Sequence, residues 1–181
     1  PLREALGRFL AEDMTSDRAV PPHDNAAVDG FAVRFDDLNP DRDTTLSVTG
    51  RVAAGHPLDR AARPGEAIRI FTGAPMPEGP DTLLMQEDCR IDGDRVIIPP
   101  GIKRGANRRH AGEDIAAGDI ILRSGHKLRP QELGLAASIG RTEISVFRPL
   151  RVALFSTGDE IRDIGQELPP GCVYDSNRYT V

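Results

Sequence analysis

Residues 23–34 read HDNAAVDGFAVR and combine two carboxylates, an amide and a glycine in one short segment. Asp24, Asn25 and Asp29 disfavour the interiors of helices and strands because their side chains compete for nearby backbone groups. Three apolar residues are expected to hold the segment against a core: Val28, Phe31 and Val33. The stretch follows Pro21-Pro22, so it either builds a tight structural turn or presents its carboxylates to a ligand.

The composition is that of an ordinary globular protein. Of the 181 residues, 39% are hydrophobic and 28% are charged. Aromatic residues make up 4% and tryptophan is absent, so aromatic stacking is not expected to drive ligand binding. The 18 glycines and 15 prolines favour short strands and turns over a helical bundle. The net charge of −5 argues against a general nucleic-acid role.

Cysteine content and hydropathy bear on the compartment. Cys89 and Cys172 are too few for a disulfide scaffold and fit a reducing cytosol, so a cytoplasmic location is expected. No apolar run approaches the roughly 18 residues of a membrane helix, and no signal-peptide pattern is present at the start. The chain begins at Pro1 and stops at Val181 in mid-pattern, so we expect it to be a piece of a longer protein.

Hydrophobic periodicity predicts a series of short elements. Helices are expected over residues 2–11 and over Pro130–Ile139, and Gly134 inside the second implies a close backbone contact. Strands are expected at 46–52, 67–71, 82–85, 95–98, 144–146 and 152–155. Asp92-Gly93 predicts a two-residue hairpin joining the third and fourth of these strands. Residues 115–128 are typical of small hairpins.

The last segment has a different character. A domain boundary is expected near Arg148-Pro149. Beyond it, Val152–Phe155 is a continuous apolar run that leads into Ser156-Thr157-Gly158-Asp159-Glu160. Such a run, ending in small and acidic residues, is typical of a buried parallel strand with a functional loop at its carboxyl end. We therefore expect the first strand of an α/β domain that this chain does not complete.

Two clusters in the middle of the chain have the residue types of anion sites. Thr72-Gly73 at a strand end offers a hydroxyl and backbone amides suited to an oxyanion, unless it belongs to a structural proline-rich loop. Residues 103–114 read KRGANRRHAGED, and arginines on a loop match phosphate oxygens bidentately. A solvated charge run is the alternative interpretation of this loop.

A further cluster lies near the end of the chain. Asp159-Glu160, together with the turn at Tyr174–Asn177, offers carboxylates suited to Mg²⁺ and a phosphate. Helix capping by Ser156 or Asp175 is the simpler interpretation. The four histidines have no metal-ligand spacing, and no P-loop, nucleophile elbow or dinucleotide fingerprint is present.

In order and spacing, these clusters resemble the molybdopterin molybdenumtransferase family, of the MoeA and gephyrin E-domain type. The matching segments are PPHDNAAVDGFAVR at 21–34, RIFTGAPMPEGPDTLLMQE at 69–87, GANRRHAGEDI at 105–115, LRPQELGLAASIG at 128–140, RVALFSTGDEI at 151–161 and YDSN at 174–177. The resemblance implies an α+β fold, with a β-rich MoeA N-terminal-type region of two subdomains followed by the truncated start of an α/β molybdopterin-binding domain. The implied bounds are subdomain I at about 1–42 and 114–148, inserted subdomain II at about 43–113, and the α/β domain at 149–181.

The resemblance also implies a function in molybdenum cofactor biosynthesis. The full-length protein would insert molybdate into adenylylated molybdopterin and release AMP in a Mg²⁺-dependent step, whereas this fragment alone would be inactive. It would act as a homodimer downstream of a molybdopterin adenylyltransferase, without nucleic-acid or membrane partners. The implied catalytic residues are Asp29, Thr72, Arg109, Asp114 and Glu160. The implied pterin-nucleotide-binding residues are Ser156, Thr157, Gly158, Asp159, Asp175, Ser176 and Asn177, and the implied metal ligands are Asp29, Asp159 and Glu160.

Two other functions stay open on the sequence. One is a non-catalytic dimerisation or scaffold module of the gephyrin kind, which would not need the acidic and arginine positions kept here. The other is a carrier of the biotinyl or lipoyl kind, indicated by the hairpin rhythm of GEDIAAGDIILRSGHKL. A carrier would require Lys127 to be exposed at a hairpin tip.

Overall fold

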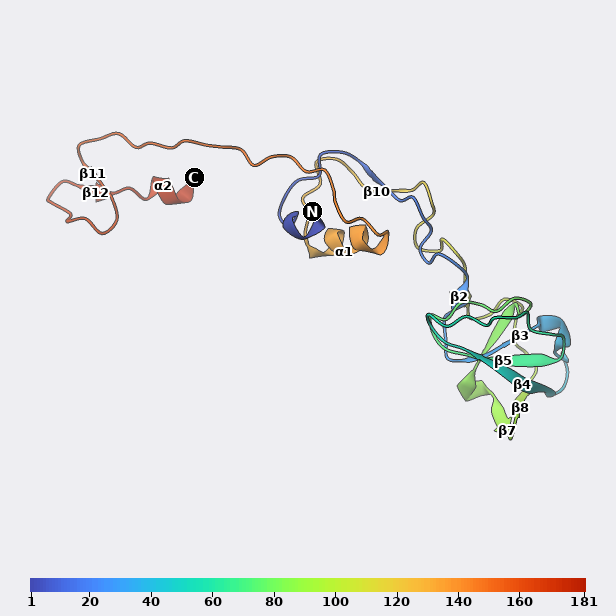
Figure 1. The fold of residues 1–181 in the computed structure, drawn as a ribbon. Helices are drawn as coiled ribbons and strands as arrows, with labels where there is room; N and C mark the ends of the chain where they lie inside the picture. The colour runs from blue at the N-terminus through green and yellow to red at the C-terminus, as the bar shows by residue number, and fades with distance from the viewer. The chain divides into compact units, whose positions relative to one another are not determined.

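The computed structural model describes residues 1–181, which divide into two units, Pro1–Phe147 and Arg148–Val181. The first unit contains a mixed β-sheet and, near its chain ends, a helix with two short paired strands (Figure 1). The second unit contains one pair of short strands and one helical turn. No helix combines the length and apolar character needed to cross a bilayer.

The largest element of the first unit is a six-stranded sheet with strand order β6-β3-β5-β4-β8-β7. Its strands are β3 (Gly30–Val33), β4 (Thr44–Val52), β5 (Glu66–Ile70), β6 (Thr82–Met85), β7 (Arg90–Asp92) and β8 (Arg95–Ile98). Strands β4 and β5 run parallel, and all other neighbours are antiparallel. Two short 3-10 helices, η2 (Phe35–Asp37) and η3 (Gln86–Asp88), follow β3 and β6.

The sheet buries apolar residues on both of its faces. Phe31 and Val33 of β3 pack into one cluster and Ala32 packs into the other, as the alternation along a strand requires. Burial on both faces explains why β3 (GFAV) contains no polar residue and why Ala67 and Ile68 are adjacent buried residues in β5. Each large side chain buried in this way contributes roughly 1.5–3 kcal/mol.

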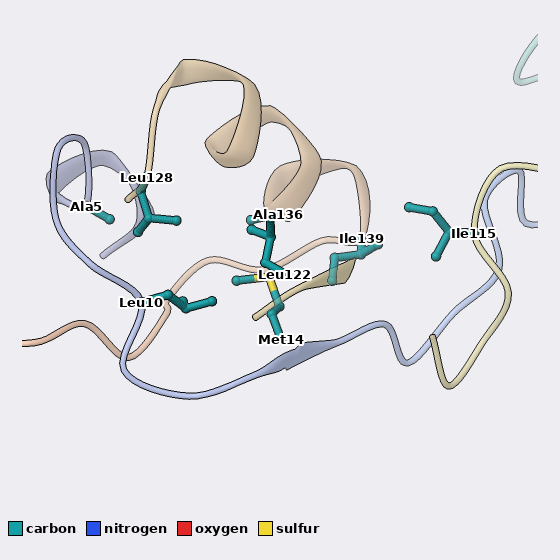
Figure 2. Close-up of a cluster of buried hydrophobic side chains, with 8 residues drawn as sticks. All are labelled: Ala5, Leu10, Met14, Ile115, Leu122, Leu128, Ala136 and Ile139. Carbon is teal, nitrogen blue, oxygen red and sulfur yellow. The ribbon is translucent and has the colours of Figure 1, made fainter. Parts of the chain in front are cut away.

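A second core lies around helix α1 (Pro130–Ser138) in the same unit. It joins the first residues of the chain to the last residues of the unit, and Figure 2 shows Met14, Leu122 and Ala136 pointing toward one another. Met14 belongs to β1 (Met14–Thr15) and Leu122 to β10 (Ile120–Leu122), which pair antiparallel. The buried members are Ala5, Leu10, Met14, Ile115, Leu122, Leu128, Ala136 and Ile139.

The helix predicted over Pro130–Ile139 is confirmed. Pro130 occupies its first turn, and Gly140 follows it with a φ of 79°, as expected for helix ends. The close contact expected at Gly134 is wrong, because a Cβ added there would meet no atom within 4 Å.

The helix predicted over residues 2–11 is wrong. Only the 3-10 turn η1 (Leu2–Glu4) forms. Gly7 adopts a φ of 76° and its N–H donates to the Leu128 carbonyl at 2.7 Å, while the N–H of Leu10 donates to the His126 carbonyl at 2.9 Å. These bonds to a distant segment replace the helical ones, and they leave Leu6 exposed at 57%.

The hairpin prediction named the wrong first strand. β6 pairs with β3, and the two-residue loop Gly93-Asp94 instead joins β7 to β8, with Asp92 opposite Arg95. Gly93 has a φ of 61°, which a two-residue hairpin requires at its first loop position. A two-residue turn therefore does form, one residue later than the predicted Asp92-Gly93. The first strand was missed because β7 is short and exposed, and its sequence pattern does not distinguish it from a loop.

The hairpins predicted within residues 115–128 do not form. β10 pairs with β1 instead, and the N–H of Val20 donates to the Ile115 carbonyl at 2.8 Å. The strand predicted at 144–146 is reduced to a single bridge between Leu10 and Val146. Both segments find their partners at the start of the chain, which local patterns do not reveal.

The inserted subdomain was expected to begin near residue 43, but the sheet also includes β3 at Gly30–Val33. A separate two-stranded ladder, β2 (Asn25–Ala26) with β9 (Arg108–Arg109), lies just outside the sheet in sequence at both ends. The sheet region of the first unit thus starts before residue 43.

The second unit contains β11 (Ile161–Arg162) and β12 (Val173–Tyr174), which pair in parallel, and α2 (Asn177–Thr180). The buried strand expected at Val152–Phe155 does not form, and Phe155 is 80% exposed. A strand needs a hydrogen-bonded neighbour, and no segment of this chain pairs with those residues. Cys89 and Cys172 are both free thiols.

A buried carboxylate stabilises the start of α1. Glu132 accepts hydrogen bonds from the backbone N–H of Arg129 at 2.9 Å and from its guanidinium at 2.7 Å. His126 Nε2 lies 3.2 Å from the same carboxylate. The Arg129 guanidinium holds the pKa of Glu132 well below its usual value, and the Arg129 N–H and His126 act in the same direction.

This carboxylate predicts a loss of local stability in acid. Because its pKa is lower in the folded protein than the ordinary value of 4.5, the unfolded chain binds the proton more readily. Its stabilising effect is therefore complete above pH 4.5 and is lost as the pH falls below that value. Glu132→Gln should raise amide hydrogen exchange across α1 at pH 7, and the difference from wild type should shrink below pH 4.5. A difference that stays constant with pH would contradict this assignment.

Candidate functional site

Asp29 and Thr72 are brought together by the pairing of β3 with β5. These strands run antiparallel with Gly30 opposite Ile70, so the residue before β3 lies near the end of β5. Asp29 Oδ1 accepts the backbone N–H of Thr72 at 2.8 Å and its hydroxyl at 2.7 Å. These two bonds, with the nearby charge of Arg69, lower the pKa of Asp29. The carboxylate is thus held ionised, and Oδ2 accepts no hydrogen bond from the chain.

Arg109 and Asp114 form a second pair. Arg109 lies in β9, and its Nη2 donates to Asp114 Oδ1 at 2.6 Å while its Nε donates to Glu113 Oε1 at 3.2 Å. The bond to Asp114 first, and that to Glu113 next, raise the pKa of Arg109. The guanidinium is fixed in orientation, and its charge is largely offset by two carboxylates.

The other carboxylate of the opening stretch has a structural role. Asp24 Oδ2 accepts Nε of Arg108 at 2.7 Å and a second bond from the same guanidinium, and Oδ1 accepts the N–H of Ala111 at 2.7 Å. The Ala111 N–H, followed by Arg108, lowers the pKa of Asp24. Asp24 therefore anchors the loop that follows β9, whereas Asp29 does not contact that loop through any hydrogen bond.

Residues 72–75 connect the two pairs. The Ala26 N–H donates to the Ala74 carbonyl at 2.9 Å, and the Gly73 N–H donates to the Ala26 carbonyl at 2.8 Å. Asn25, the neighbour of Ala26 in β2, lies opposite Arg109 in the ladder. Asn25 Oδ1 is buried without a hydrogen-bond partner. The Thr72 turn and the Arg109 strand thus adjoin the same two residues of β2.

The basic loop at residues 103–114 is not a free anion site. Arg104 donates to Asp81 at 2.7 Å, also pairs with Asp36, and stacks on Phe35 at 4.7 Å. Arg108 and Arg109 are each engaged by a carboxylate as well. Most of the positive charge of this loop is therefore neutralised by ion pairs within the protein.

In the second unit, Asp175 is saturated by its own chain. It is 3% exposed, accepts the Ser156 hydroxyl at 2.6 Å and accepts the backbone N–H of Arg178 at 3.2 Å, just inside α2. The Ser156 hydroxyl is the main cause of its lowered pKa. The helix-capping interpretation thus holds for Asp175, which accepts an N–H of α2, but not for Ser156, whose hydroxyl donates to Asp175.

The remaining predicted residues of this unit lie at its surface. Thr157, Gly158, Asp159 and Glu160 precede β11, and Ser176 and Asn177 begin α2; all six are exposed. Gly158 has a φ of 147°, and a Cβ there would overlap the Glu160 carboxylate. The positive φ favours glycine here, whereas the exposed Glu160 side chain could move aside. The carboxylates of Asp159 and Glu160 accept no hydrogen bond from the chain.

The carboxylates fit a hard cation only in part. Within neither unit do three or more His, Cys, Asp or Glu side chains gather as a metal site. Mg²⁺, however, is commonly held by one or two carboxylates with substrate phosphates and water. In the first unit Asp29 Oδ2 is an unengaged oxygen of the right type, and in the second unit the carboxylates of Asp159 and Glu160 are as well.

Sequence reasoning missed Arg69, whose charge helps to lower the pKa of Asp29. An arginine inside the otherwise apolar strand AIRIF at 67–71 was a signal for it. The carrier interpretation is not supported, because Lys127 forms a bridge with Phe9 and lies after the turn closed between Arg123 and His126, not at its tip.

Comparison with known proteins gives one consistent result. Residues 1–140 match the family model for the MoeA N-terminal region (domain I and II). A molybdopterin molybdenumtransferase of Haemophilus influenzae is 43% identical over 181 residues, covering 99% of this chain and 44% of that protein. One from Nostoc sp. is 39% identical over 180 residues, covering 98% of this chain and 41% of that protein.

A solved structure agrees with the sequence comparison. The crystal structure of the molybdopterin biosynthesis MoeA protein from Pyrococcus horikoshii OT3 has a TM-score of 0.92 and 33% identity to this chain, covering 99% of it and 49% of that chain. The expected β-rich MoeA-type fold is confirmed, and the chain spans about half the length of the relatives it matches. This chain therefore belongs to the MoeA family, through its N-terminal region.

Proposed function

We propose that the full-length protein is a molybdopterin molybdenumtransferase of molybdenum cofactor biosynthesis. It inserts molybdate into adenylylated molybdopterin and releases AMP. The observation that carries the proposal is the Asp29–Thr72 pair, whose two hydrogen bonds join two separate segments of the region that matches the family model. The names of relatives up to 43% identical support the same reaction.

The ionisation of Asp29 limits its role in this reaction. A molybdate oxygen that leaves as water needs protons, and a carboxyl with a lowered pKa is a poor acid near neutral pH. We assign Asp29 to binding and charge stabilisation, with Thr72 fixing its orientation. Asp114 and Glu113 fix the orientation of Arg109 and offset most of its charge, so we assign Arg109 to directed N–H donation toward the substrate and not to the role of a free cation.

Asp29 in the first unit, and Asp159 and Glu160 in the second, are each proposed as Mg²⁺ ligands, and bound Mg²⁺ would offset the phosphate charge of the substrate. The exposed residues of the loop at 156–160 are proposed to line the pterin-nucleotide pocket, together with Asp175, Ser176 and Asn177. Asp175 would act there by holding Ser156 in place, since its own oxygens are already engaged.

A cytoplasmic homodimer is the proposed assembly, supplied by a molybdopterin adenylyltransferase. An exposed apolar strip in the first unit supports the homodimer, because Leu6, Phe9 and Phe147 are 57%, 48% and 53% exposed. Phe9 and Phe147 are neighbours, since the Phe147 N–H donates to the Phe9 carbonyl at 2.9 Å. The opposite subunit is proposed to contribute its α/β domain to the site.

The test is cofactor formation by the purified full-length protein. Given adenylylated molybdopterin, molybdate and Mg²⁺, it should produce a cofactor that activates an apo-molybdoenzyme. A folded, dimeric protein that forms no cofactor with all three supplied would refute the proposal.

A further inference from the structure

A bulge in β4 sets which of its residues lie on the same face of the sheet as Arg69. The register between β4 and β5 shifts between Val48 and Gly50. Val48 packs against the cluster containing Phe31, yet a Cβ on Gly50 would meet Ile68 of the opposite cluster. In a regular strand, Val48 and Gly50 would lie on the same face of the sheet, because side chains alternate between the faces. The bulge reverses this alternation after Val48, and Arg51 therefore lies on the face that contains Phe31. Bulges re-aim side chains in this way next to functional sites.

Arg51 and Arg69 then share one aromatic ring. They are direct partners in the ladder between β4 and β5. The guanidinium carbon of Arg51 lies 4.6 Å from the centre of the Phe71 ring, and that of Arg69 lies 5.1 Å from it. Arg69 also stacks on Phe31 at 4.9 Å. Cation–π contacts therefore position both side chains.

Neither of these two guanidiniums forms an ion pair, in contrast to Arg104, Arg108 and Arg109. Arg69 donates to the side-chain oxygen of Gln86 and, at 3.5 Å, to the Gly30 carbonyl, whereas the Arg51 side chain makes no hydrogen bond within the chain. Two like charges held beside one ring repel each other. A bound anion would relieve that repulsion and use the free donors.

The two arginines lie close to the Asp29–Thr72 pair of the proposed site. Phe71, the ring that both arginines contact, is followed directly by Thr72, which binds Asp29. Arg69 is close enough to Asp29 for its charge to affect that carboxylate. The two guanidiniums, neither of which is in an ion pair, thus adjoin the Asp29–Thr72 pair.

We propose that Arg51 and Arg69 bind a tetrahedral oxyanion of the substrate next to the Asp29–Thr72 pair. The inference rests on the proposed function, in which such an anion has two sources: the phosphoanhydride of the pterin nucleotide and free molybdate. Both have oxygens that match the planar donor fork of a guanidinium.

Arginine labelling of the wild-type full-length protein tests this without any substitution. Phenylglyoxal modifies accessible guanidiniums, and peptide mass spectrometry reads each site separately. At ten times its dissociation constant, a ligand leaves about one site in eleven free, so labelling of Arg51 and Arg69 should slow about tenfold. Arg95, exposed on β8 without an ion pair, is the internal control and should not be protected.

Inorganic phosphate, AMP and molybdate are the separate probes. Protection by phosphate or AMP assigns the site to the phosphoanhydride, and protection by molybdate alone assigns it to the metal oxyanion. Protection of neither arginine by any probe, or equal protection of Arg95, would overturn the inference.

Variants separate this inference from the proposed function. Arg51→Gln and Arg69→Gln should weaken binding of the protecting anion about tenfold by calorimetry, and Arg95→Gln less than about twofold. If wild type forms cofactor and both variants bind and react normally, the inference fails while the function stands. If wild type forms none yet both arginines are protected, the function fails while the anion site stands.

Discussion

Replacing Asp29 by alanine in the full-length protein should lower cofactor formation at least about 100-fold while leaving the fold intact. The carboxylate contacts only Thr72 through hydrogen bonds and lies outside all three apolar clusters. Its removal therefore costs little packing and removes the ionised group of the site.

Glu160→Ala should have the same effect, because its exposed carboxylate makes no bond that supports the fold. Single-turnover formation of cofactor, with circular dichroism on the same samples, measures both quantities.

Asp24→Ala is the matched control within the same stretch. It should destabilise the protein by about 1–2 kcal/mol, because Arg108 and the Ala111 N–H lose their acceptor. The folded fraction should still form cofactor at a rate close to wild type. Near-normal activity of Asp29→Ala, or a larger activity loss in Asp24→Ala than in Asp29→Ala, would contradict the roles assigned here.

Gly30→Ala should prevent the sheet from forming correctly. A Cβ at this position would overlap the backbone carbonyl oxygen of Leu84 and lie 2.9 Å from its carbonyl carbon. The neighbour is backbone of β6, paired with β3, so no flexible side chain can move aside. We expect a loss of at least about 3 kcal/mol in unfolding free energy, seen by urea denaturation as an early transition or as insoluble protein.

The chain offers an opposite case in Gly134→Ala. A Cβ there meets nothing within 4 Å, and the residue lies inside α1. Alanine should stabilise the helix by about 0.5–1 kcal/mol. If Gly30→Ala is tolerated as well as Gly134→Ala, the close approach of β3 and β6 is wrong.

The sequence predicted correctly those helices and strands whose ends or alternation can be recognised from neighbouring residues. Pro130 and Gly140 bound α1, and the alternation in 46–52 gave most of β4. The helix over 2–11 failed because Gly7 turns the chain toward Leu128, a partner more than a hundred residues away. The predicted pairing of β6 with β8 was wrong for the same reason, because β6 pairs with β3, which is distant in sequence, and no local pattern indicates that contact.

The sequence drew attention to Asp24 and Asp29 but not to the different contacts that each of them makes. Asp24 and Asp29 are equivalent by residue type, and their distant partners separate them: Arg108 for the first and Thr72 for the second. Arg51 could not be foreseen at all, because its face depends on one bulge in β4. Such choices depend on three-dimensional pairing and become visible only in the folded chain.

The most direct measurement is AMP release by the purified full-length protein from adenylylated molybdopterin, with and without molybdate. We predict that AMP appears only when molybdate is present, in amounts equal to the molybdenum incorporated, and that Asp29→Ala releases almost none. AMP release at the same rate without molybdate, or molybdenum incorporation without AMP, would contradict the proposed reaction.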